Sequence, residues 1–269
     1  MSVASTRYRP HRPIGDLLRE WRQRRQLSQL DLAIQAEISA RHLSFVETGR
    51  SKPTSEMILR LTEHLDVPLR DRNTLLLAGG YAPAYPENRL DGPELAAVRG
   101  ALRHVLAGHE PYPAVVVNRW WELADGNAAV SVLTEGAAPE LLAPPVNALR
   151  LSLHPDGMAP RIDNLAEYSA HLLTRLHRQA VLSADPALAA LHEELRQYPG
   201  VASAPSSAVD PAALLFVPLR LRTPDGHPLT FFSTVATFGT ALDITMAELA
   251  IESFFPADAA TETFLRGQP

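Results

Sequence analysis

The chain has 269 residues, 46% of them hydrophobic and 20% charged, which is typical of a globular protein long enough for two modest domains. The absence of cysteine excludes disulfides, thiolate catalysis and cysteine-ligated zinc. The net charge is +4 over residues 1–80 (13 Lys and Arg, 9 Asp and Glu) and −9 over residues 81–269 (12 and 21), which predicts that only the N-terminal part meets a polyanion.

Neither a secretory signal nor a membrane span is visible in the sequence. The first residues contain no apolar segment, and no apolar run approaches the roughly 18 residues that a spanning helix needs. We therefore expect a cytoplasmic protein without membrane contact.

Residues 14–80 are predicted to form five short helices, preceded by a flexible arm at residues 1–13. Apolar residues recur at helical spacing in this region, as they do from Ile14 to Trp21. Thr54 is typical of a helix N-cap, and a glycine pair closes the last helix.

Residues 28–53 carry two helical patterns that are capped by Ser28 and Ser39 and joined by a very short turn. Such helices must cross steeply, as in a helix-turn-helix, whose second helix enters the DNA major groove. We expect Arg41 to donate to a guanine edge. The other predicted DNA contacts are Gln29, Arg50 and Lys52 near phosphates, and Ser39, Ala40, Ser44 and Phe45 on the outward side of the second helix.

The segment from Leu27 to Pro68 resembles the five-helix DNA-binding domain of the XRE/Cro-type bacterial regulators. A pair of helices that only pack together is the alternative. The resemblance implies binding to double-stranded operator DNA. It rests on Ser28-Gln29, Leu32-Ala33, Ile38-Ser39, Val46-Glu47, Gly49-Arg50 and Pro53.

Residues 81–93, rich in Pro and polar residues, are a predicted linker, and residues 94–269 a second domain with an antiparallel sheet and helices. A strand, a tight turn at Asp125-Gly126 and a second strand are expected near its start. Residues 164–197 read as two helices. A hairpin follows around Pro224-Asp225-Gly226, and residues 247–258 are expected to form a last strand or a short helix.

Three segments of this second domain, residues 109–129, 150–164 and 231–258, resemble the MmyB-like ligand-binding domain. The resemblance implies a PAS-like fold that encloses an apolar pocket for a fatty-acid-like molecule. The expected fold class is thus an all-α five-helix helix-turn-helix domain followed by an α+β PAS-like domain.

An effector pocket needs apolar walls and a few polar groups, although each apolar candidate can equally fill the core. Trp120 and Trp121 are expected to face opposite sides of a strand. Arg150 and His154 are the candidates for binding an acidic group, with Arg119 and His171 as weaker alternatives. The candidate walls are Val115, Val117, Trp120, Trp121, Leu133, Phe231, Val235 and Phe238.

No catalytic motif is present, and the ten histidines lack metal-ligand spacing, so we expect neither an enzyme nor a metal or other cofactor, apart from a bound lipophilic molecule. The sequence predicts a transcriptional regulator that senses a small lipophilic effector and binds a pseudo-palindromic operator as a homodimer. Phe254-Phe255 can serve that dimer or the core. The alternative is a second domain that serves as a protein-interaction or dimerisation module without a ligand.

Overall fold

The computed structural model describes residues 12–201 and 217–267 of the chain. The chain divides into two compact units, one formed by Met1–Glu87 with Leu242–Ile244, the other by Asn88–Ala241 with Thr245–Pro269. Most of the predicted N-terminal arm, residues 1–11, lies outside the described residues. Each unit has a hydrophobic core of its own.

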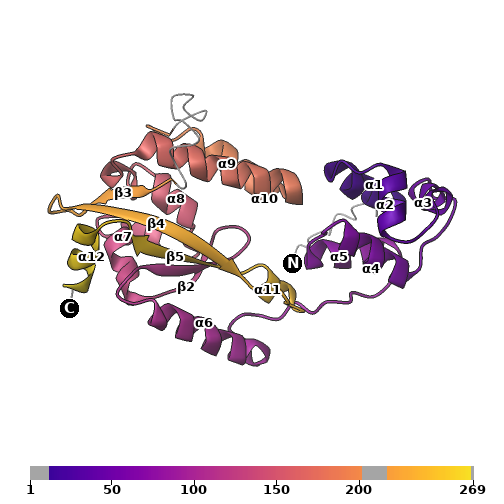
Figure 1. Ribbon diagram of the computed structural model, residues 1–269, viewed down its shortest axis with the longest axis horizontal. Coiled ribbons are helices and arrows are strands. Elements are labelled where there is room, and N and C mark those ends of the chain that lie inside the picture. The colour runs from indigo at the N-terminus through magenta and orange to yellow at the C-terminus, as the bar shows by residue number, and fades with distance from the viewer. Residues whose placement is uncertain (1–11, 202–216, 268–269) are drawn as a thin grey trace, which may run out of the picture. The chain divides into compact units, whose positions relative to one another are not determined.

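Five helices form the first unit, as the apolar spacing predicts (Figure 1). Their apolar sides meet in one core, in which Leu18, Leu32, Leu43 and Leu61 are fully shielded from solvent. The helices are α1 (Ile14–Arg24), α2 (Gln29–Gln35), α3 (Ala40–Glu47), α4 (Ser55–His64) and α5 (Leu69–Ala78).

Three of these helices begin at the caps that the sequence predicts. Ser28 Oγ accepts a hydrogen bond from the backbone N–H of Asp31, whose carboxylate accepts from the N–H of Ser28, which is a capping box. Ser39 and Thr54 each accept from the backbone N–H three residues later. Glu37 has a φ of +52°, and this left-handed residue lets the chain turn sharply from α2 into α3.

The second unit contains a five-stranded antiparallel sheet with the strand order β2-β1-β5-β4-β3, together with helices that lie on its two faces (Figure 1). This confirms the predicted fold class. The strands are β1 (Ala114–Val117), β2 (Leu123–Gly126), β3 (Leu219–Arg222), β4 (Pro228–Thr237) and β5 (Ala250–Pro256). The helices are α6 (Ala96–Gly108), α7 (Ser131–Thr134), α8 (Ala148–Leu153), α9 (Leu165–Ser183), α10 (Pro186–Leu195), α11 (Ile244–Ala247) and α12 (Ala259–Arg266).

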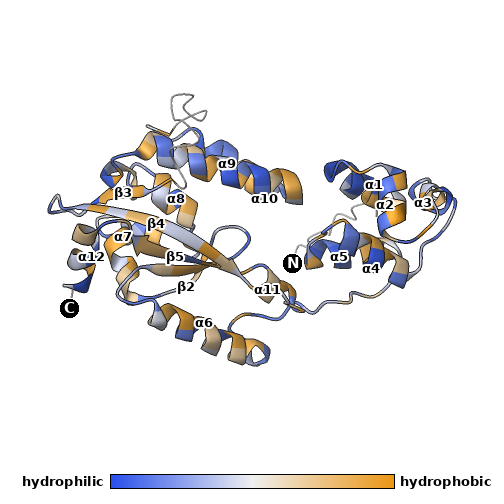
Figure 2. Ribbon diagram, viewed as in Figure 1, coloured by the Kyte–Doolittle hydropathy of each residue, from blue (hydrophilic) through white to orange (hydrophobic). Residues whose placement is uncertain are grey.

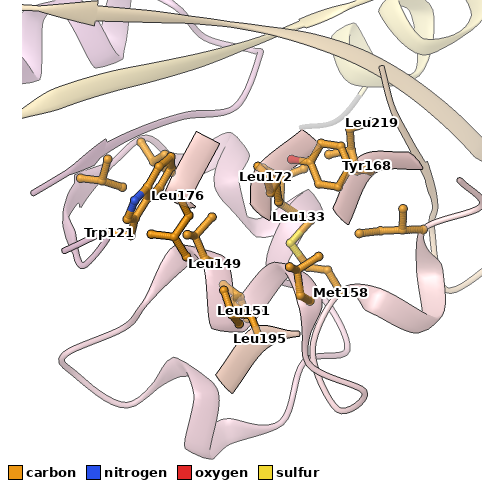
Figure 3. Packing of buried hydrophobic residues seen from close by; sticks show 14 of the residues in the cluster. Trp121, Leu133, Leu149, Leu151, Met158, Tyr168, Leu172, Leu176, Leu195 and Leu219 are labelled. Atoms are coloured by element: carbon orange, nitrogen blue, oxygen red, sulfur yellow. The ribbon is translucent and has the colours of Figure 1, made fainter. Parts of the chain in front are cut away.

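The two faces of the sheet belong to two different cores, because alternate strand residues point to opposite sides. Val115 and Val117 of β1 join the larger core, which also contains residues of α8, α9 and α10 (Figure 3). Ala114 and Val116 join a smaller core with α6. The helices that cover these faces carry apolar and polar sides (Figure 2). The larger core is the one that holds most of the predicted pocket residues.

The tight turn near the start of the second unit lies elsewhere than predicted. Asp125 and Gly126 belong to β2, where they pair with Val116 and Val115. The chain reverses instead between Asn118 and Glu122, and the backbone N–H of Glu122 donates to the side chain of Asn118. The prediction failed because an Asp-Gly pair has the same turn chemistry whether or not the chain turns there, and Asn118 supplies the alternative.

The other predicted elements of the second unit are present. The two helices expected at residues 164–197 are α9 and α10, and the hairpin of β3 and β4 turns with Gly226 at a φ of +87°. For residues 247–258 the sequence allows either a last strand or a short helix, and in the structure most of them form the strand β5. This strand occupies the centre of the sheet, between β1 and β4.

Candidate DNA interface and effector site

The outward side of α3 and the segment just after it present two cations beside an aromatic ring. Arg41 and Arg50 are exposed, and their guanidinium carbons lie 5.3 and 5.9 Å from the centre of the Phe45 ring. Cation–π attraction of this kind favours a fixed position for a long side chain. Arg41 lies in the first turn of α3, where the recognition helix of a helix-turn-helix contacts bases.

The smaller predicted residues of α3 have structural roles as well. Ser39 is exposed and caps the helix, whereas Ala40 packs against the helical core. The backbone carbonyl of Ser44 accepts a hydrogen bond of 2.7 Å from Thr48 Oγ1, near the end of the helix. Ser39 and Ala40 therefore fix where the helix begins and how it sits on the core.

The two predicted phosphate contacts at the edges of the motif differ in their surroundings. Lys52 is exposed, with Nζ 5.5 Å from the centre of the Tyr81 ring. Gln29 is half-buried, and its Nε2 donates a hydrogen bond of 2.8 Å to Glu47. One of the two N–H groups of the Gln29 amide is thus already used inside the protein.

Glu47, at the end of α3, is held by a network that ties this helix to α1. Its carboxylate, fully shielded from solvent, accepts 2.7 and 2.9 Å hydrogen bonds from Nε and Nη2 of Arg22. Burial alone would raise the pKa of Glu47. The hydrogen bonds from Arg22 and Gln29 and the charges of Arg22 and Arg19 outweigh burial and hold that pKa below its usual value.

A glycine allows α1 and α3 to approach each other closely. A Cβ atom on Gly15 would lie 2.4 Å from the carbonyl oxygen of Val46 and 2.9 Å from that of Glu47. Only a residue without a side chain fits between these backbones. Gly15 and the Glu47 network together set the position of α3 on the first unit.

Most of the predicted pocket walls in the second unit lie in its larger core. Trp120 packs against this core from a half-buried position. Trp120 and Trp121 do not alternate along a strand, because both lie in the turn between β1 and β2. The expected strand placement was wrong for the same reason as the misplaced turn, although the two side chains do differ as expected, with Trp121 buried and Trp120 half-buried. The predicted wall residues that belong to this core are Val115, Val117, Trp121, Leu133 and Phe231.

Two predicted wall residues, Val235 of β4 and Phe238 just after this strand, lie outside that core. Val235 is on the same face as Phe231, four residues earlier, but it is 43% exposed. Phe238 packs against the smaller core with α6, on the opposite face. An odd separation from Phe231 gives Phe238 the opposite orientation in an extended chain.

The cationic residues predicted to hold an acidic group already have partners. Arg150 is exposed and forms a bidentate pair with Glu194, at 2.7 and 2.8 Å. His154 lies at the end of α8, where its Nδ1 accepts a hydrogen bond of 3.0 Å from the backbone N–H of Asp156. Arg150 therefore joins α8 to α10, whereas His154 stabilises the turn that follows α8.

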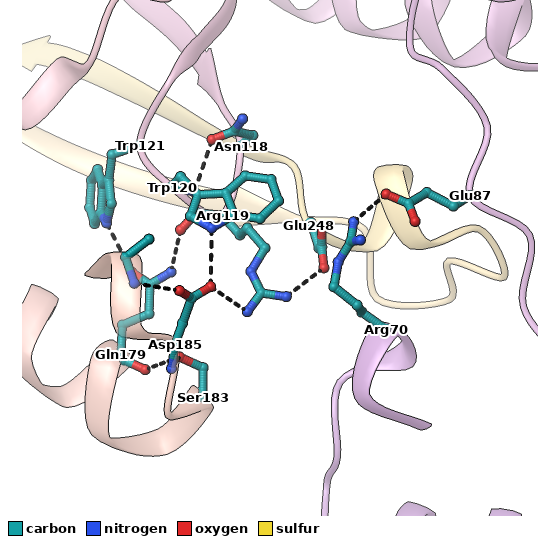
Figure 4. Close-up of polar contacts among 11 residues, drawn as sticks. Arg70, Glu87, Asn118, Arg119, Trp120, Trp121, Gln179, Ser183, Asp185 and Glu248 are labelled. Atoms are coloured by element: carbon teal, nitrogen blue, oxygen red, sulfur yellow. Dashed lines mark hydrogen bonds and ion pairs between the residues drawn. The ribbon is translucent and has the colours of Figure 1, made fainter. Parts of the chain in front are cut away.

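Arg119, a weaker candidate, is satisfied as well (Figure 4). Its Nη2 donates to Asp185 at 2.9 Å and its Nη1 to Glu248 at 3.0 Å. The indole N–H of Trp120 donates to the same carboxylate of Asp185. This network joins the turn after β1 to the start of α10 and to the segment before β5.

A polar cluster that the sequence reading missed lies on the face of the larger core. Glu252, in the central strand β5, is 7% exposed, and its Oε1 accepts a 3.0 Å hydrogen bond from Ser233 of β4. Arg175 of α9 lies with Nη1 3.6 Å from Glu252 Oε2. Glu252 lies on the same face of β5 as Ala250 and Phe254, which pack in the larger core, and this inward placement of a charge is a signal that the sequence did contain.

Two neighbouring titratable groups respond to this cluster. Burial and the negative charge of Glu252 raise the pKa of the Tyr168 hydroxyl. Burial and the positive charge of Arg175 lower the pKa of His171, against the influence of Glu252. His171 is therefore neutral at pH 7, and the charges in the cluster are those of Arg175 and Glu252.

Trp121 holds Arg175 from the other side and has a strained backbone. Its φ is +66°, in a left-handed conformation that a bulky residue seldom adopts. Its backbone N–H donates to the carbonyl oxygen of Asn118 and so closes the turn between β1 and β2. The left-handed position of such a turn usually carries glycine. The indole N–H donates to Gln179, and the ring centre lies 4.4 Å from the guanidinium carbon of Arg175. The strain is thus accompanied by two contacts that glycine cannot make.

Within the described ranges, no group of three or more His, Asp or Glu side chains is placed to hold a metal ion. Over the same residues, no helix is both long and apolar enough to cross a membrane.

The sequence matches two family models. The MmyB-like transcription regulator ligand binding domain matches residues 98–267, and a helix-turn-helix domain matches residues 13–75. No curated protein matches the chain. Among solved structures, the clp gene regulator ClgR from Corynebacterium glutamicum is similar at 23% identity over 36% of this chain and 90% of that one, with a TM-score of 0.22. An RNA-binding light-oxygen-voltage receptor is similar at 15% identity over 96% of this chain and 62% of that one, with a TM-score of 0.30.

Proposed function

This chain belongs to the transcription regulators with an MmyB-like ligand-binding domain, and we propose that it binds operator DNA through α3 and senses a small lipophilic, fatty-acid-like effector. The single observation that best supports the DNA-binding part is the pair of exposed arginines, Arg41 on α3 and Arg50 just after it, beside the half-buried Phe45, on a helix that Glu47 and Gly15 hold in place. A fixed helix with outward cations suits base recognition, because side chains must reach base edges in one register.

A gel-shift assay with Arg41→Ala tests the assignment to base recognition. Arg41→Ala should abolish the preference for the operator over unrelated DNA, since bidentate contacts to guanine carry sequence information. Lys52→Ala should weaken binding to all sequences alike and reduce its dependence on salt, as expected of a phosphate contact. Arg103→Ala, an exposed site on α6 in the second unit, is the control for lost charge and should change neither property. Unchanged discrimination by Arg41→Ala would remove Arg41 from base recognition.

The regulator acts as a homodimer on a pseudo-palindromic site, because one helix-turn-helix contacts too few bases for useful specificity. Effector binding alters DNA affinity if the effector prefers one arrangement of the two DNA-binding units over another. Light scattering after size-exclusion chromatography measures the mass of the free protein. A monomer that stays monomeric on operator DNA would contradict this part of the proposal.

Support for a lipophilic effector comes from the family and from the larger core, into which Trp121 and Phe231 project. Native and denaturing mass spectrometry of the purified protein tests it directly. A fatty acid or similar lipid released on denaturation is the expected result, and it would supply a ligand for DNA-binding titrations. An empty protein would favour the alternative, in which the second unit binds another protein or a second copy of the chain.

A further inference from the structure

Arg175 differs from the other half-buried arginines of the second unit. Arg99 and Arg161 donate to backbone carbonyls, and Arg119 donates to two carboxylates. In the part of the chain that the structure describes, Arg175 donates no hydrogen bond. Its ion pair with Glu252 spans 3.6 Å, which is longer than a hydrogen bond. The donors of this guanidinium are therefore available to a ligand.

The guanidinium of Arg175 is nevertheless held in a defined place. The ring of Trp121 packs against it at 4.4 Å, and Gln179, which accepts from the Trp121 indole, lies one turn further along the same helix α9. The side chain is 28% exposed, so a ligand can reach it from solvent. A prepositioned and accessible cation with free donors suits recognition of an anion, because little further ordering is needed.

An exposed part of the sheet adjoins this cation. Val115, Glu252 and Val235 lie side by side on three neighbouring strands, on the face of the larger core. The first two are 7% exposed, whereas Val235 on β4 is 43% exposed. The residues that pack on this face therefore shield β1 and β5 but leave the apolar side chain of Val235 on β4, next to Glu252, exposed to solvent.

We propose that Arg175 binds the single negative charge of an amphiphilic effector whose apolar chain covers the exposed face of β4 at Val235. This rests on the proposed sensing function and adds the residue that would select an acid. The adjacent Glu252 does not forbid a second carboxylate on this guanidinium. Arg119 of the same unit holds two carboxylates at 2.9 and 3.0 Å with a side chain only 12% exposed.

A cationic ligand fits the cluster less well. The Glu252 side chain is 10% exposed against 28% for Arg175, and one of its oxygens already accepts from Ser233. The accessible charge of the cluster is therefore the positive one, whereas the negative charge lies deeper and is partly satisfied.

Isothermal titration calorimetry with three twelve-carbon probes tests the inference on delipidated full-length protein. The probes are dodecanoate, dodecan-1-ol and dodecylammonium, which share an apolar chain and differ in charge. The wild type should bind dodecanoate about tenfold or more tightly than dodecan-1-ol, since hydrogen bonds to charged groups are the strong ones. Arg175→Gln should remove this preference and keep the affinity for dodecan-1-ol. Arg150→Gln, which removes an exposed arginine paired with Glu194, is the matched control and should keep the preference.

Each other outcome has a definite meaning. Equal binding of acid and alcohol by the wild type, or an unchanged preference in Arg175→Gln, overturns the inference and leaves a lipophilic effector standing. A preference for dodecylammonium overturns it in favour of Glu252. If no probe binds, both the inference and the lipophilic effector fail. Should Arg175→Gln not fold, Arg175→Lys decides, because a reduced preference supports the inference and a full one overturns it.

Discussion

Each unit of the molecule buries a glutamate beside an arginine, and the two pairs are built differently. In the first unit, Glu47 accepts two hydrogen bonds from Arg22 and one from Gln29. In the second, Glu252 accepts one hydrogen bond, from Ser233, and its arginine stands 3.6 Å away. The carboxylate of Glu47 is thus saturated by the protein, whereas the cation beside Glu252 is not.

This difference in hydrogen bonding makes Glu47 and Arg22 a structural pair, whereas Arg175 beside Glu252 is suited to binding a ligand. A buried charge is tolerated when hydrogen bonds replace the water that it loses, and the Glu47 network meets that condition. It fastens α3 to α1, and so α3 is held in a fixed position. Among the described residues Arg175 finds no hydrogen-bond acceptor, and it stays partly exposed, which is costly for stability alone and useful where a ligand completes the site.

The largest effect that would sharpen this comparison is expected at Glu47. Glu47→Gln should lower the free energy of unfolding of the first unit by about 3 kcal/mol, because it leaves the charge of Arg22 uncompensated. Glu252→Gln should cost about 1 kcal/mol, since an amide oxygen can still accept from Ser233. Hydrogen exchange of the full chain, resolved to α1, α3 and β5, measures both.

A control separates these effects from a general effect of lost charge. Glu63→Gln on the exposed side of α4 should leave the exchange rates of all three segments unchanged. Equal destabilisation by Glu47→Gln and Glu252→Gln would break the comparison, because it would make Arg175 and Glu252 a structural pair like the first.

A smaller effect is expected from the close approach of α1 and α3. Gly15→Ala should destabilise the first unit by about 2 kcal/mol, because the added Cβ forces two backbones apart. It should also weaken DNA binding by displacing α3. Gly100→Ala is the matched control, since a Cβ there meets no atom within 4 Å and alanine should stabilise α6 by about 1 kcal/mol. Hydrogen exchange in each unit during thermal unfolding measures both effects. Stabilisation by both substitutions would contradict the prediction.

The smallest effect is expected from pH. The pKa of Glu47 is lowered in the folded state, so its contribution to stability is complete above the unfolded value of about 4.3 and is lost as the pH falls through the folded value. At pH 4 only part of that contribution should be lost from the wild type. The Glu47→Gln variant has no carboxylate at this position and should not lose stability for this reason. The unfolding free energies of the wild type and the variant should therefore converge as the pH falls. Parallel curves from pH 7 to pH 3 would show that Glu47 does not supply this dependence.

Local chemistry made much of the fold predictable. The five helices of the first unit follow from apolar spacing and from the caps at Ser28, Ser39 and Thr54, all of which act within one helical turn. Val115 and Phe231, named from the sequence as candidate pocket walls or core, lie in the larger core. The DNA-contacting role of α3 remains a prediction, although its exposed cations lie where the helix-turn-helix geometry requires them.

The sequence by itself determined the five helices of the first unit and, in the second, the helix pair α9 and α10 and the hairpin of β3 and β4, because those depend on residues a few positions apart. Only the tertiary structure decided which charges meet. Arg150 looked free for a ligand, yet packing places it against Glu194, 44 residues away. Arg175 attracted no attention in the sequence, yet the crossing of α9 over the sheet brings it to Glu252 and Trp121 without a hydrogen bond. Such partners are set by how elements pack, and no local spacing encodes them.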